Sequence, residues 1–253
     1  MLMLERQKEI LAYLSRKKSV TVRVLARHLY VSEATIRRDL SEMEKMGLLS
    51  RTHGGAVIFE QTKGEISQFV REQKNTKEKK MLAEAALDFI QSTHTIFLDS
   101  SSTVGTIIPA LGQYTGLTVV TTGLKNAILL SEHVNGRIYL PGGHIHFSSN
   151  SIVGGDTIEY LSHFYPDVAF MSCAGIDASS GITETSFEQA QIKRAVIQNA
   201  KAKILMADSS KFEKTCLCRV SGFDGFDYCI SDRLPGDPIL QRMSVEGCEF
   251  IRA

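Results

Sequence analysis

Two runs of acidic, hydroxyl and basic side chains have the chemistry to hold a phosphorylated small molecule. The first run comprises Asp99, Ser100, Ser101, Ser102 and Thr103. The second run, residues 207–212, supplies the carboxylate of Asp208, two serine hydroxyls and the ammonium group of Lys211. Hydroxyls and amides at a helix N-terminus suit a phosphate, and a lysine adds a full positive charge. Each run alone is also typical of a helix cap or a surface loop. Together they favour a pocket for a hydroxylated anion, and a sugar phosphate fits best.

The elements that must position these runs are short apolar segments typical of buried strands. They are residues 95–98, 117–121, 137–140, 167–171, 203–207 and 228–230. Helical patterns lie between most of them, which predicts an α/β domain with a mostly parallel sheet flanked by helices. Such sheets bind ligands at the carboxyl ends of their strands. Gly142 and Gly143 follow the third strand, and residues 175–183 are expected to form a polar loop after the fourth, before a helix bearing Glu188, Lys193 and Arg194.

A different chemistry is expected near the N-terminus, where Arg37 and Arg38 lie on a predicted helix. Ser32 is a good N-cap for this helix. The apolar face comprises Ala34, Ile36, Leu40 and Met43, and the opposite face Glu33, Thr35, Arg37, Arg38 and Glu42. A shorter helix through Val22, Leu25, Ala26 and Leu29 precedes it. Two helices joined by a tight turn, the second with basic residues in its first turns, indicate a helix-turn-helix that enters the DNA major groove.

The segment after this helix resembles a wing. Gly47 is expected to end the helix, and residues 48–51 and 56–59 to form strands around a turn at Gly54 and Gly55. The wing carries Arg51 and His53. An earlier helix through Ile10, Leu11 and Leu14 is expected to pack behind the helix-turn-helix.

Charge is distributed in agreement with this interpretation. Residues 1–56 contain 11 Lys and Arg against 6 Asp and Glu, whereas the remainder contains 18 against 22. The net charge of the whole chain is only +1. A basic N-terminal region on a mildly acidic body is the asymmetry expected when one domain alone approaches phosphates.

The composition excludes several classes of protein. The chain has 253 residues, 43% of them hydrophobic and 23% charged, which is ordinary for a globular protein. No apolar run approaches the ~18 residues of a membrane helix, so no membrane partner is expected. Five cysteines without a framework of spacings favour idle thiols in a reducing cytoplasm over disulfides or a zinc site. Nucleotide-binding glycine motifs are absent, so no cofactor is predicted.

These patterns divide the chain into three parts. We expect a winged helix-turn-helix domain over residues 1–58, a linker over residues 59–75 and an α/β sensor domain over residues 76–253. The linker is polar and is expected to be partly helical.

The chain closely resembles the DeoR family of bacterial transcription regulators. The resemblance is carried by VSEATIRRDLSEMEKMGLLSRTHGGA near the N-terminus, and then by DSSST, VVTTGL, LPGG, FEQAQIKRAVI and ADSSKF in the same order. It implies a repressor of sugar or polyol operons that responds to a phosphorylated sugar. It also implies a sensor domain similar to ribose-5-phosphate isomerase and CoA-transferases, and a homodimer or homotetramer.

The resemblance assigns roles to individual residues. Those expected to contact operator DNA are Ser32, Thr35, Arg37, Arg38, Arg51, His53, Gly54 and Gly55. Those expected to bind the effector are Asp99, Ser100, Ser101, Ser102, Thr103, Thr121, Gly142, Gly143, Lys193, Asp208 and Lys211. The family often has Thr-Asn-Ser where this chain has Thr121, Thr122 and Gly123, so an amide and a hydroxyl are missing here.

The sequence leaves three alternatives open. The body could be an isomerase-like sugar-phosphate enzyme tethered to DNA, with Asp99, Asp177, Glu188 or Asp208 as the general base. The protein could activate transcription in response to the same ligand class. His144 and His146 would share one face of a strand and permit metal binding, but no third ligand is evident, so we interpret them as pocket rim or surface.

Overall fold

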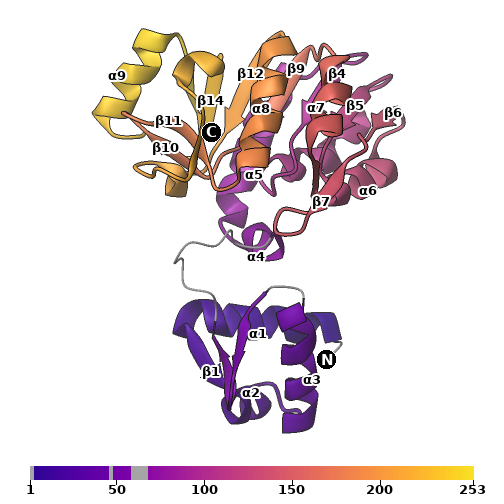
Figure 1. Cartoon of the computed structure of the whole chain (residues 1–253), viewed down its shortest axis with the longest axis vertical. Coiled ribbons are helices and arrows are strands. Elements are labelled where there is room, and N and C mark those ends of the chain that lie inside the picture. The colour runs from indigo at the N-terminus through magenta and orange to yellow at the C-terminus, as the bar shows by residue number, and fades with distance from the viewer. Residues whose placement is uncertain (1–2, 46–47, 58–67) are drawn as a thin grey trace. The chain divides into compact units, whose positions relative to one another are not determined.

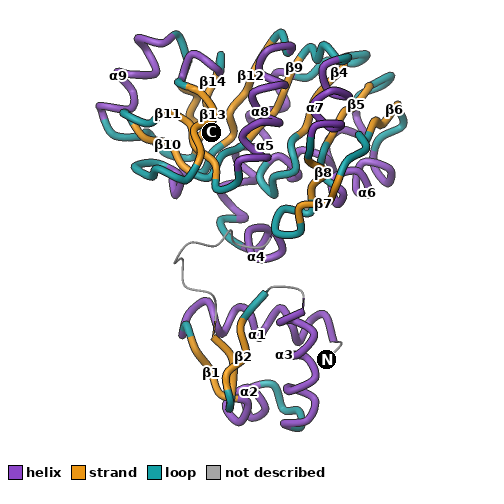
Figure 2. Tube along the Cα trace, viewed as in Figure 1, coloured by secondary structure: helices purple, strands orange, loops and turns teal. Residues whose placement is uncertain are grey.

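The computed structural model describes residues 3–45, 48–57 and 68–253. The chain divides into two compact units, Met1–Arg71 and Glu72–Ala253. We call them the N-terminal unit and the C-terminal unit. Figure 1 shows each unit with its helices and strands, and Figure 2 distinguishes the two kinds of element by colour.

The N-terminal unit is a winged helix-turn-helix. In chain order its elements are α1 (Met3–Lys17), β1 (Ser19–Thr21), α2 (Val22–His28), α3 (Glu33–Lys45), β2 (Ser50–Thr52) and β3 (Gly55–Val57), and α4 (Gln68–Gln73) begins within it. The α1, α2 and α3 helices share one apolar core whose fully buried side chains include Ile10, Leu14, Leu25, Ile36, Leu40 and Met43. The predicted helix-turn-helix and the packing of the first helix behind it are therefore confirmed.

The prediction that Ala34 is buried was wrong. Ala34 is exposed, because it lies two residues, or about 200°, from Ile36 around the helix. Asp39 takes a place on the buried face instead. Its carboxylate accepts hydrogen bonds at 2.5 and 3.0 Å from the guanidinium group of Arg6 on α1. This buried pair ties the first helix to the third.

The wing differs in detail from its prediction. The hairpin turn falls at His53 and Gly54, and Gly55 already belongs to β3. β3 pairs with β2 on one side and with β1 on the other, and β1 was not predicted. A side chain at Gly55 would meet the Val20 carbonyl oxygen at 2.0 Å, so the close approach to β1 requires glycine. The predicted helix end at Gly47 and most of the predicted linker lie outside the described residues.

The C-terminal unit is an α/β domain. Its helices are α5 (Thr76–Ala86), α6 (Leu124–His133), α7 (Gly155–Ser162), α8 (Phe187–Asn199) and α9 (Asp237–Glu246), with 3-10 helices η1 (Leu87–Phe89), η2 (Val104–Gln113), η3 (Ser209–Lys211) and η4 (Phe223–Gly225). The strands of its main sheet are β4 (Thr95–Leu98), β5 (Thr118–Thr121), β6 (Arg137–Tyr139), β9 (Val168–Met171), β12 (Ala202–Met206), β14 (Tyr228–Ser231) and β15 (Glu249–Arg252).

These seven strands pair in parallel in the order β15-β14-β12-β9-β4-β5-β6. All six predicted strands are present, and β15 is an addition. Alternate residues of the strands face two cores, one of which contains α5 and η2 side chains and the other α8 and α9 side chains. Figure 1 shows the sheet between these layers. The predicted fold class is confirmed.

Residues 175–183 do not form the predicted polar loop. They form a hairpin of β10 (Gly175–Asp177) and β11 (Gly181–Glu184), which joins β13 (Cys218–Ser221) in a small antiparallel sheet. Ile176 and Ile182 are fully buried in the core under α8, which explains why this segment is a strand pair. A second hairpin consists of β7 (His144–His146) and β8 (Ser151–Val153).

No described helix has the length and apolar character needed to cross a membrane. The predicted boundaries at residues 58 and 75 stay predictions.

Candidate functional site

The candidate site lies where the order of the main sheet changes direction. From β4 the chain builds outward through β5 and β6, and then returns to place β9 on the other side of β4. The carboxyl ends of β4 and β9 therefore flank a switch point, the usual ligand position in open α/β sheets. Residues 99–103 follow β4 and form what we call the serine loop, and Ser172 follows β9.

Asp99 anchors the serine loop. One of its carboxylate oxygens accepts a hydrogen bond from the Ser101 amide at 2.8 Å, and the other accepts one from the Ser172 amide, also at 2.8 Å. Its backbone carbonyl accepts a hydrogen bond from the Asn126 side chain at 2.8 Å. Asp99 is only 2% exposed, and these bonds fix the loop against β9 and α6.

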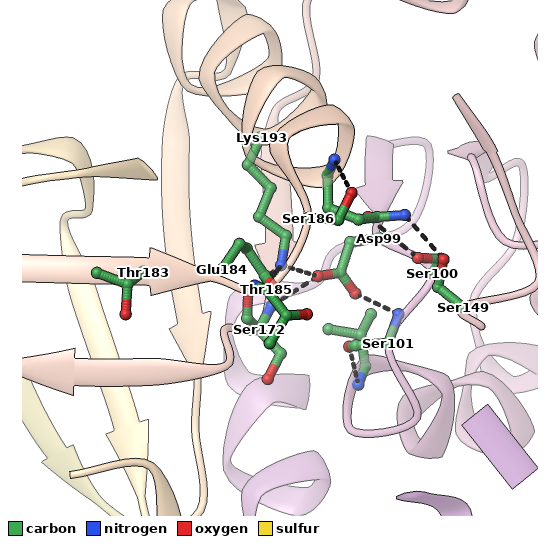
Figure 3. Close-up of polar contacts among 12 residues, drawn as sticks. Asp99, Ser100, Ser101, Ser149, Ser172, Thr183, Glu184, Thr185, Ser186 and Lys193 are labelled. Carbon is green, nitrogen blue, oxygen red and sulfur yellow. Dashed lines mark hydrogen bonds and ion pairs between the residues drawn. The ribbon is translucent and has the colours of Figure 1, made fainter. Parts of the chain in front are cut away.

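Lys193 joins this anchor to a third segment. Its ammonium group lies 3.2 Å from the Asp99 carboxylate, pairs with the carboxylate of Glu184 on β11, and donates a hydrogen bond to the Ser172 carbonyl. Figure 3 shows the Lys193 side chain reaching from α8 to these partners. An ammonium group has three N–H donors. Two of them donate hydrogen bonds, to Glu184 and to the Ser172 carbonyl, and the ammonium group also forms the ion pair with Asp99.

The electrostatics follow from this geometry. Burial lowers the pKa of Lys193, but the carboxylates of Glu184 and Asp99 more than offset it, so the pKa is raised above its usual value. Burial also raises the pKa of the neighbouring Cys173 thiol to about 12, and the Glu184 charge adds to this effect. Lys193 is therefore charged and Cys173 protonated at neutral pH.

A chain of polar side chains continues from the serine loop to the β7–β8 hairpin. The Ser100 hydroxyl lies at 3.5 Å from the Gln189 side-chain oxygen. The Gln189 amide group donates to the hydroxyls of Ser149 and Ser151, and Ser149 contacts the His146 ring at 2.9 Å. Parts of this chain are visible in Figure 3. The predicted surface position of His144 and His146 agrees with their partial to full exposure.

Thr121 lies beside the serine loop, at the end of β5. Its hydroxyl accepts a hydrogen bond from the Gly123 amide at 3.2 Å. A side chain at Gly123 would come within 2.9 Å of the Ser100 Cα atom, so the two loops are in contact. The Thr122 hydroxyl is buried and has no hydrogen-bond partner among the described residues.

The second predicted run, around Asp208, meets the start of α5. The Asp208 carboxylate accepts hydrogen bonds from the Ser210 amide at 3.1 Å and from the Asn75 side chain at 2.8 Å. Asn75 also donates to the Ser210 hydroxyl at 3.2 Å. Lys211, at the end of η3, is half-buried, and its charge acts on the same Cys173 thiol as that of Lys193.

The first turn of α5 reaches the serine loop as well. Lys79 is 4% exposed, and its ammonium group donates a hydrogen bond to the Ser102 hydroxyl at 3.0 Å. The Thr106 hydroxyl in turn donates to the Lys79 carbonyl at 3.2 Å. Through Asn75 and Lys79, one helical turn contacts both predicted runs.

Gly142 and Gly143 contact α7 and β8. The Gly142 carbonyl accepts a hydrogen bond from the Thr157 hydroxyl at 2.8 Å. Gly143 has a φ of +145°, and a side chain there would meet the Thr157 hydroxyl at 2.3 Å, so the position requires glycine. Among the described residues, no hydrogen bond joins either glycine to the serine loop.

The residues predicted to contact DNA are mostly exposed. The Ser32 hydroxyl accepts a hydrogen bond from the Thr35 amide at 3.1 Å, which confirms Ser32 as the N-cap of α3. Arg37 forms an exposed ion pair with Glu33 at 3.0 Å, one helical turn earlier. Arg38, Arg51, His53 and Gly54 are exposed, Thr35 is half-buried, and Gly55 is buried. Their contacts with DNA stay predictions.

Metal and disulfide chemistry find no support in the described part of the chain. It contains no group of three or more His, Cys, Asp or Glu side chains able to hold a metal ion. Its five cysteines are free thiols.

Several site residues were missed, and for one of them the sequence carried a signal. Lys79 stands three, four and seven residues before Leu82, Ala83 and Ala86, which form the buried face of α5. The same periodicity that locates this face places Lys79 on it. Glu184, Ser172 and Asn75 carry no such signal, because their partners come from distant segments.

Comparison with known proteins agrees with this architecture. Residues 6–62 match the family described as DeoR-like helix-turn-helix domain, and residues 74–233 match the DeoR C terminal sensor domain. The chain is 35% identical over 232 residues to an uncharacterized HTH-type transcriptional regulator, YulB, of Bacillus subtilis strain 168, covering 92% of this chain and 90% of the relative. It is 28% identical to the glycerol-3-phosphate regulon repressor of Escherichia coli strain K12, covering 94% of each chain.

Among solved structures, a D-ribose-5-phosphate isomerase in complex with phospho-erythronic acid is similar over 54% of each chain, with a TM-score of 0.41 and 20% sequence identity. A similarity of this degree carries no functional inference.

A winged helix-turn-helix followed by an α/β unit with a polar switch point defines a two-part regulator, with one unit for DNA and one for a signal. The chain belongs to the DeoR family of transcriptional regulators. It is thus a DNA-binding regulator with a sensor domain, as the resemblance implied.

Proposed function

We propose that this protein represses a carbohydrate-metabolism operon and that a phosphorylated sugar or polyol, bound at the switch point of the C-terminal unit, changes its affinity for the operator. The observation that carries the proposal is the serine loop, which presents hydroxyls and amides at the carboxyl end of β4 with the buried Lys79 ammonium against it. Operator DNA lies in the cytoplasm, where we place the protein.

The ligand class follows from the chemistry of the loop. Amides, hydroxyls and a cation suit a phosphate dianion, and a free sugar would leave the cation and amides without an anion. The printed name of one relative, a glycerol-3-phosphate regulon repressor, supports a phosphorylated polyol or sugar. We place the ligand beside Ser100 to Thr103, with Thr121, Gly142, Gly143, Asp208 and Lys211 as the further predicted contacts.

The DNA contacts proposed are those of α3 and the wing. Arg37 and Arg38 are both exposed and lie about 100° apart around α3, so one can reach a base edge while the other binds phosphate. Because one small domain makes few contacts, two copies on repeated half-sites are needed for firm specific binding. We therefore propose a homodimer or homotetramer, and sedimentation at micromolar concentration would show a monomer if this is wrong.

The alternative of a DNA-tethered enzyme is disfavoured by the state of the four candidate bases. A general base near neutral pH needs a raised carboxylate pKa. Hydrogen bonds from Ser179 and Ser180 instead lower the pKa of Asp177, and those from its own amide and Ser186 lower that of Glu188. Asp99 and Asp208 are occupied by the hydrogen bonds described above. We therefore propose ligand binding without turnover.

The test compares matched ligands on the full chain. Phosphorylated sugars are expected to raise the melting temperature and change operator affinity several-fold to about a hundred-fold, the range of ordinary allosteric coupling. The corresponding free sugars should do neither. A free sugar or a nucleotide that stabilises the protein while all sugar phosphates fail would refute the ligand class. Conversion of a sugar phosphate during incubation would favour the enzyme, and tighter operator binding with ligand would favour an activator or corepressor mode.

A further inference from the structure

We propose that Lys79 is the principal phosphate-binding cation of the effector site, in a subsite completed by the hydroxyl of Ser102 and the backbone amides of Ser102 and Thr103. This inference rests on the proposed function and deepens it. It assigns the phosphate to one end of the switch point and gives Asp99 and Lys193 a supporting role instead of a ligand-binding one.

Asp99 and Lys193 are already bound to each other and to further protein groups. The Asp99 carboxylate accepts hydrogen bonds from two backbone amides and forms an ion pair with Lys193. The Lys193 ammonium group donates hydrogen bonds to Glu184 and to the Ser172 carbonyl. A ligand phosphate would have to displace Lys193 from two buried carboxylates, which costs far more than it returns. These residues hold the serine loop in shape.

The serine loop still offers backbone donors at Ser102 and Thr103. The Ser101 amide is bonded to Asp99, and the Val104 amide donates to the Ser101 hydroxyl at 3.1 Å. Among the described residues, the amides of Ser102 and Thr103 between them donate no hydrogen bond. Consecutive amides of this kind form a concave site for an anion.

Lys79 lies against this part of the serine loop. It is 4% exposed, and its hydrogen bond to the Ser102 hydroxyl places the ammonium nitrogen at the same end of the loop as the two amides. A buried cation interacts with an anion more strongly than a surface cation does, because less solvent screens it. Lys211 is half-buried on η3, and no hydrogen bond or ion pair joins it to the serine loop among the described residues.

Lys79 also connects the phosphate subsite to the second predicted run, around Asp208. The Lys79 amide donates to the Asn75 carbonyl at 3.0 Å, and Asn75 binds the Asp208 carboxylate and the Ser210 hydroxyl. A ligand bound by Lys79 and the serine loop would therefore contact the helical turn of α5 that links the two predicted runs.

Inorganic phosphate is the probe that isolates this subsite. The full-length protein and its variants are titrated with phosphate at constant ionic strength, and the melting temperature is followed. The wild type and Lys80→Met, which removes the adjacent exposed lysine, should be stabilised equally. Lys79→Met should bind phosphate at least about tenfold more weakly, since a charge-assisted hydrogen bond is lost, and Lys79→Arg should recover part of the affinity.

The remaining outcomes distinguish a failure of the Lys79 subsite from a failure of the proposed function. Phosphate binding by Lys79→Met at the wild-type level, or its loss in Lys211→Ala alone, would overturn the Lys79 subsite and leave the proposed function standing. If the wild type ignores inorganic phosphate but responds to sugar phosphates, the subsite is likewise wrong. No response to either would refute both. Should Lys79→Met fail to fold, Ser102→Ala replaces it, and unchanged phosphate binding by that variant would also overturn the subsite.

Discussion

The recognition helix and the switch point use charge in opposite ways. Arg37 and Arg38 on α3 are exposed, and Arg37 forms a local ion pair with Glu33, one helical turn earlier. At the switch point, Lys193 and Asp99 are buried, and their partners come from β11 and from the end of β9. The exposed arginines of α3 leave positive charge available to a polyanion such as DNA. The buried network at the switch point instead stabilises the shape of the serine loop.

This difference in burial explains how strongly each unit responds to the loss of a charged side chain. Exposed ion pairs contribute little to stability, so α3 can exchange them for contacts with DNA. A buried charge network is destabilised strongly when one member is lost, so the serine loop has one well-defined shape into which a ligand fits. Among the described residues of the N-terminal unit, the pair of Arg6 with Asp39 is of the second kind, and it fixes α3 rather than reading DNA.

The largest effect is expected from Lys193→Met. It leaves the Asp99 and Glu184 carboxylates buried without their cation, and should cost the C-terminal unit about 3–5 kcal/mol. Hydrogen–deuterium exchange in peptides of β4, β9 and α8 measures the loss. Lys201→Met is the matched control, because Lys201 is an exposed lysine paired with the half-buried Asp167 and its loss should cost at most about 1 kcal/mol.

The same variant has a defined pH dependence. Because the pKa of Lys193 is raised in the folded state, its contribution is fully present below the unfolded lysine pKa of about 10.4 and is lost only as the pH rises through the folded value. The difference in the free energy of unfolding between Lys193→Met and the wild type should therefore stay constant from neutral pH to about pH 9. A cost equal to that of Lys201→Met would show that the network is not stabilising.

A second prediction tests the buried pair of the N-terminal unit. Arg6→Ala leaves the Asp39 carboxylate, 2% exposed, without its two hydrogen bonds to the guanidinium group. Loss of hydrogen bonds to a charged group costs about 1.5–3 kcal/mol. Exchange should accelerate in α1 and α3 peptides and stay unchanged in the C-terminal unit. Unchanged exchange in α3 would mean that the apolar core alone fixes this helix.

The sequence predicts which residues of an element are buried, but not which residues of distant segments they contact. Periodicity located the helix-turn-helix and six strands of the main sheet, because apolar residues at fixed spacing report which side of an element is buried. It also places Asp39, Lys79 and Lys193 among the buried residues of their helices, since each follows the apolar spacing of its neighbours. It cannot name Arg6, Ser102 or Glu184 as their partners, because those contacts depend on how distant segments pack. The hairpin at residues 175–183 was missed because its two buried isoleucines, Ile176 and Ile182, stand among glycine and polar residues that are typical of a loop.

A third prediction concerns the exposed arginines. Arg38→Ala should cost about 1–3 kcal/mol of operator affinity, and Arg37→Ala a similar or smaller amount, because Glu33 already neutralises part of the Arg37 charge. Neither should change the melting temperature. Fluorescence anisotropy with an operator fragment at near-physiological salt measures both, and Arg233→Ala, an exposed arginine of the C-terminal unit, is the control. Wild-type affinity in both variants would refute α3 as the DNA-reading helix.

The smallest effect is expected from Glu33→Gln. The pair with Arg37 is exposed and one turn apart, so its loss should cost α3 only about 0.5 kcal/mol. Removing an acidic group beside the proposed DNA surface frees Arg37 for a phosphate. Operator binding should therefore tighten a few-fold, and its dependence on salt should steepen by about one released counterion. Glu84→Gln, which neutralises an exposed acid on α5, should do neither. Weaker binding by Glu33→Gln would reverse the interpretation, because the carboxylate would then be accepting a hydrogen bond from a base, and α3 would read DNA through its acid as well as its arginines.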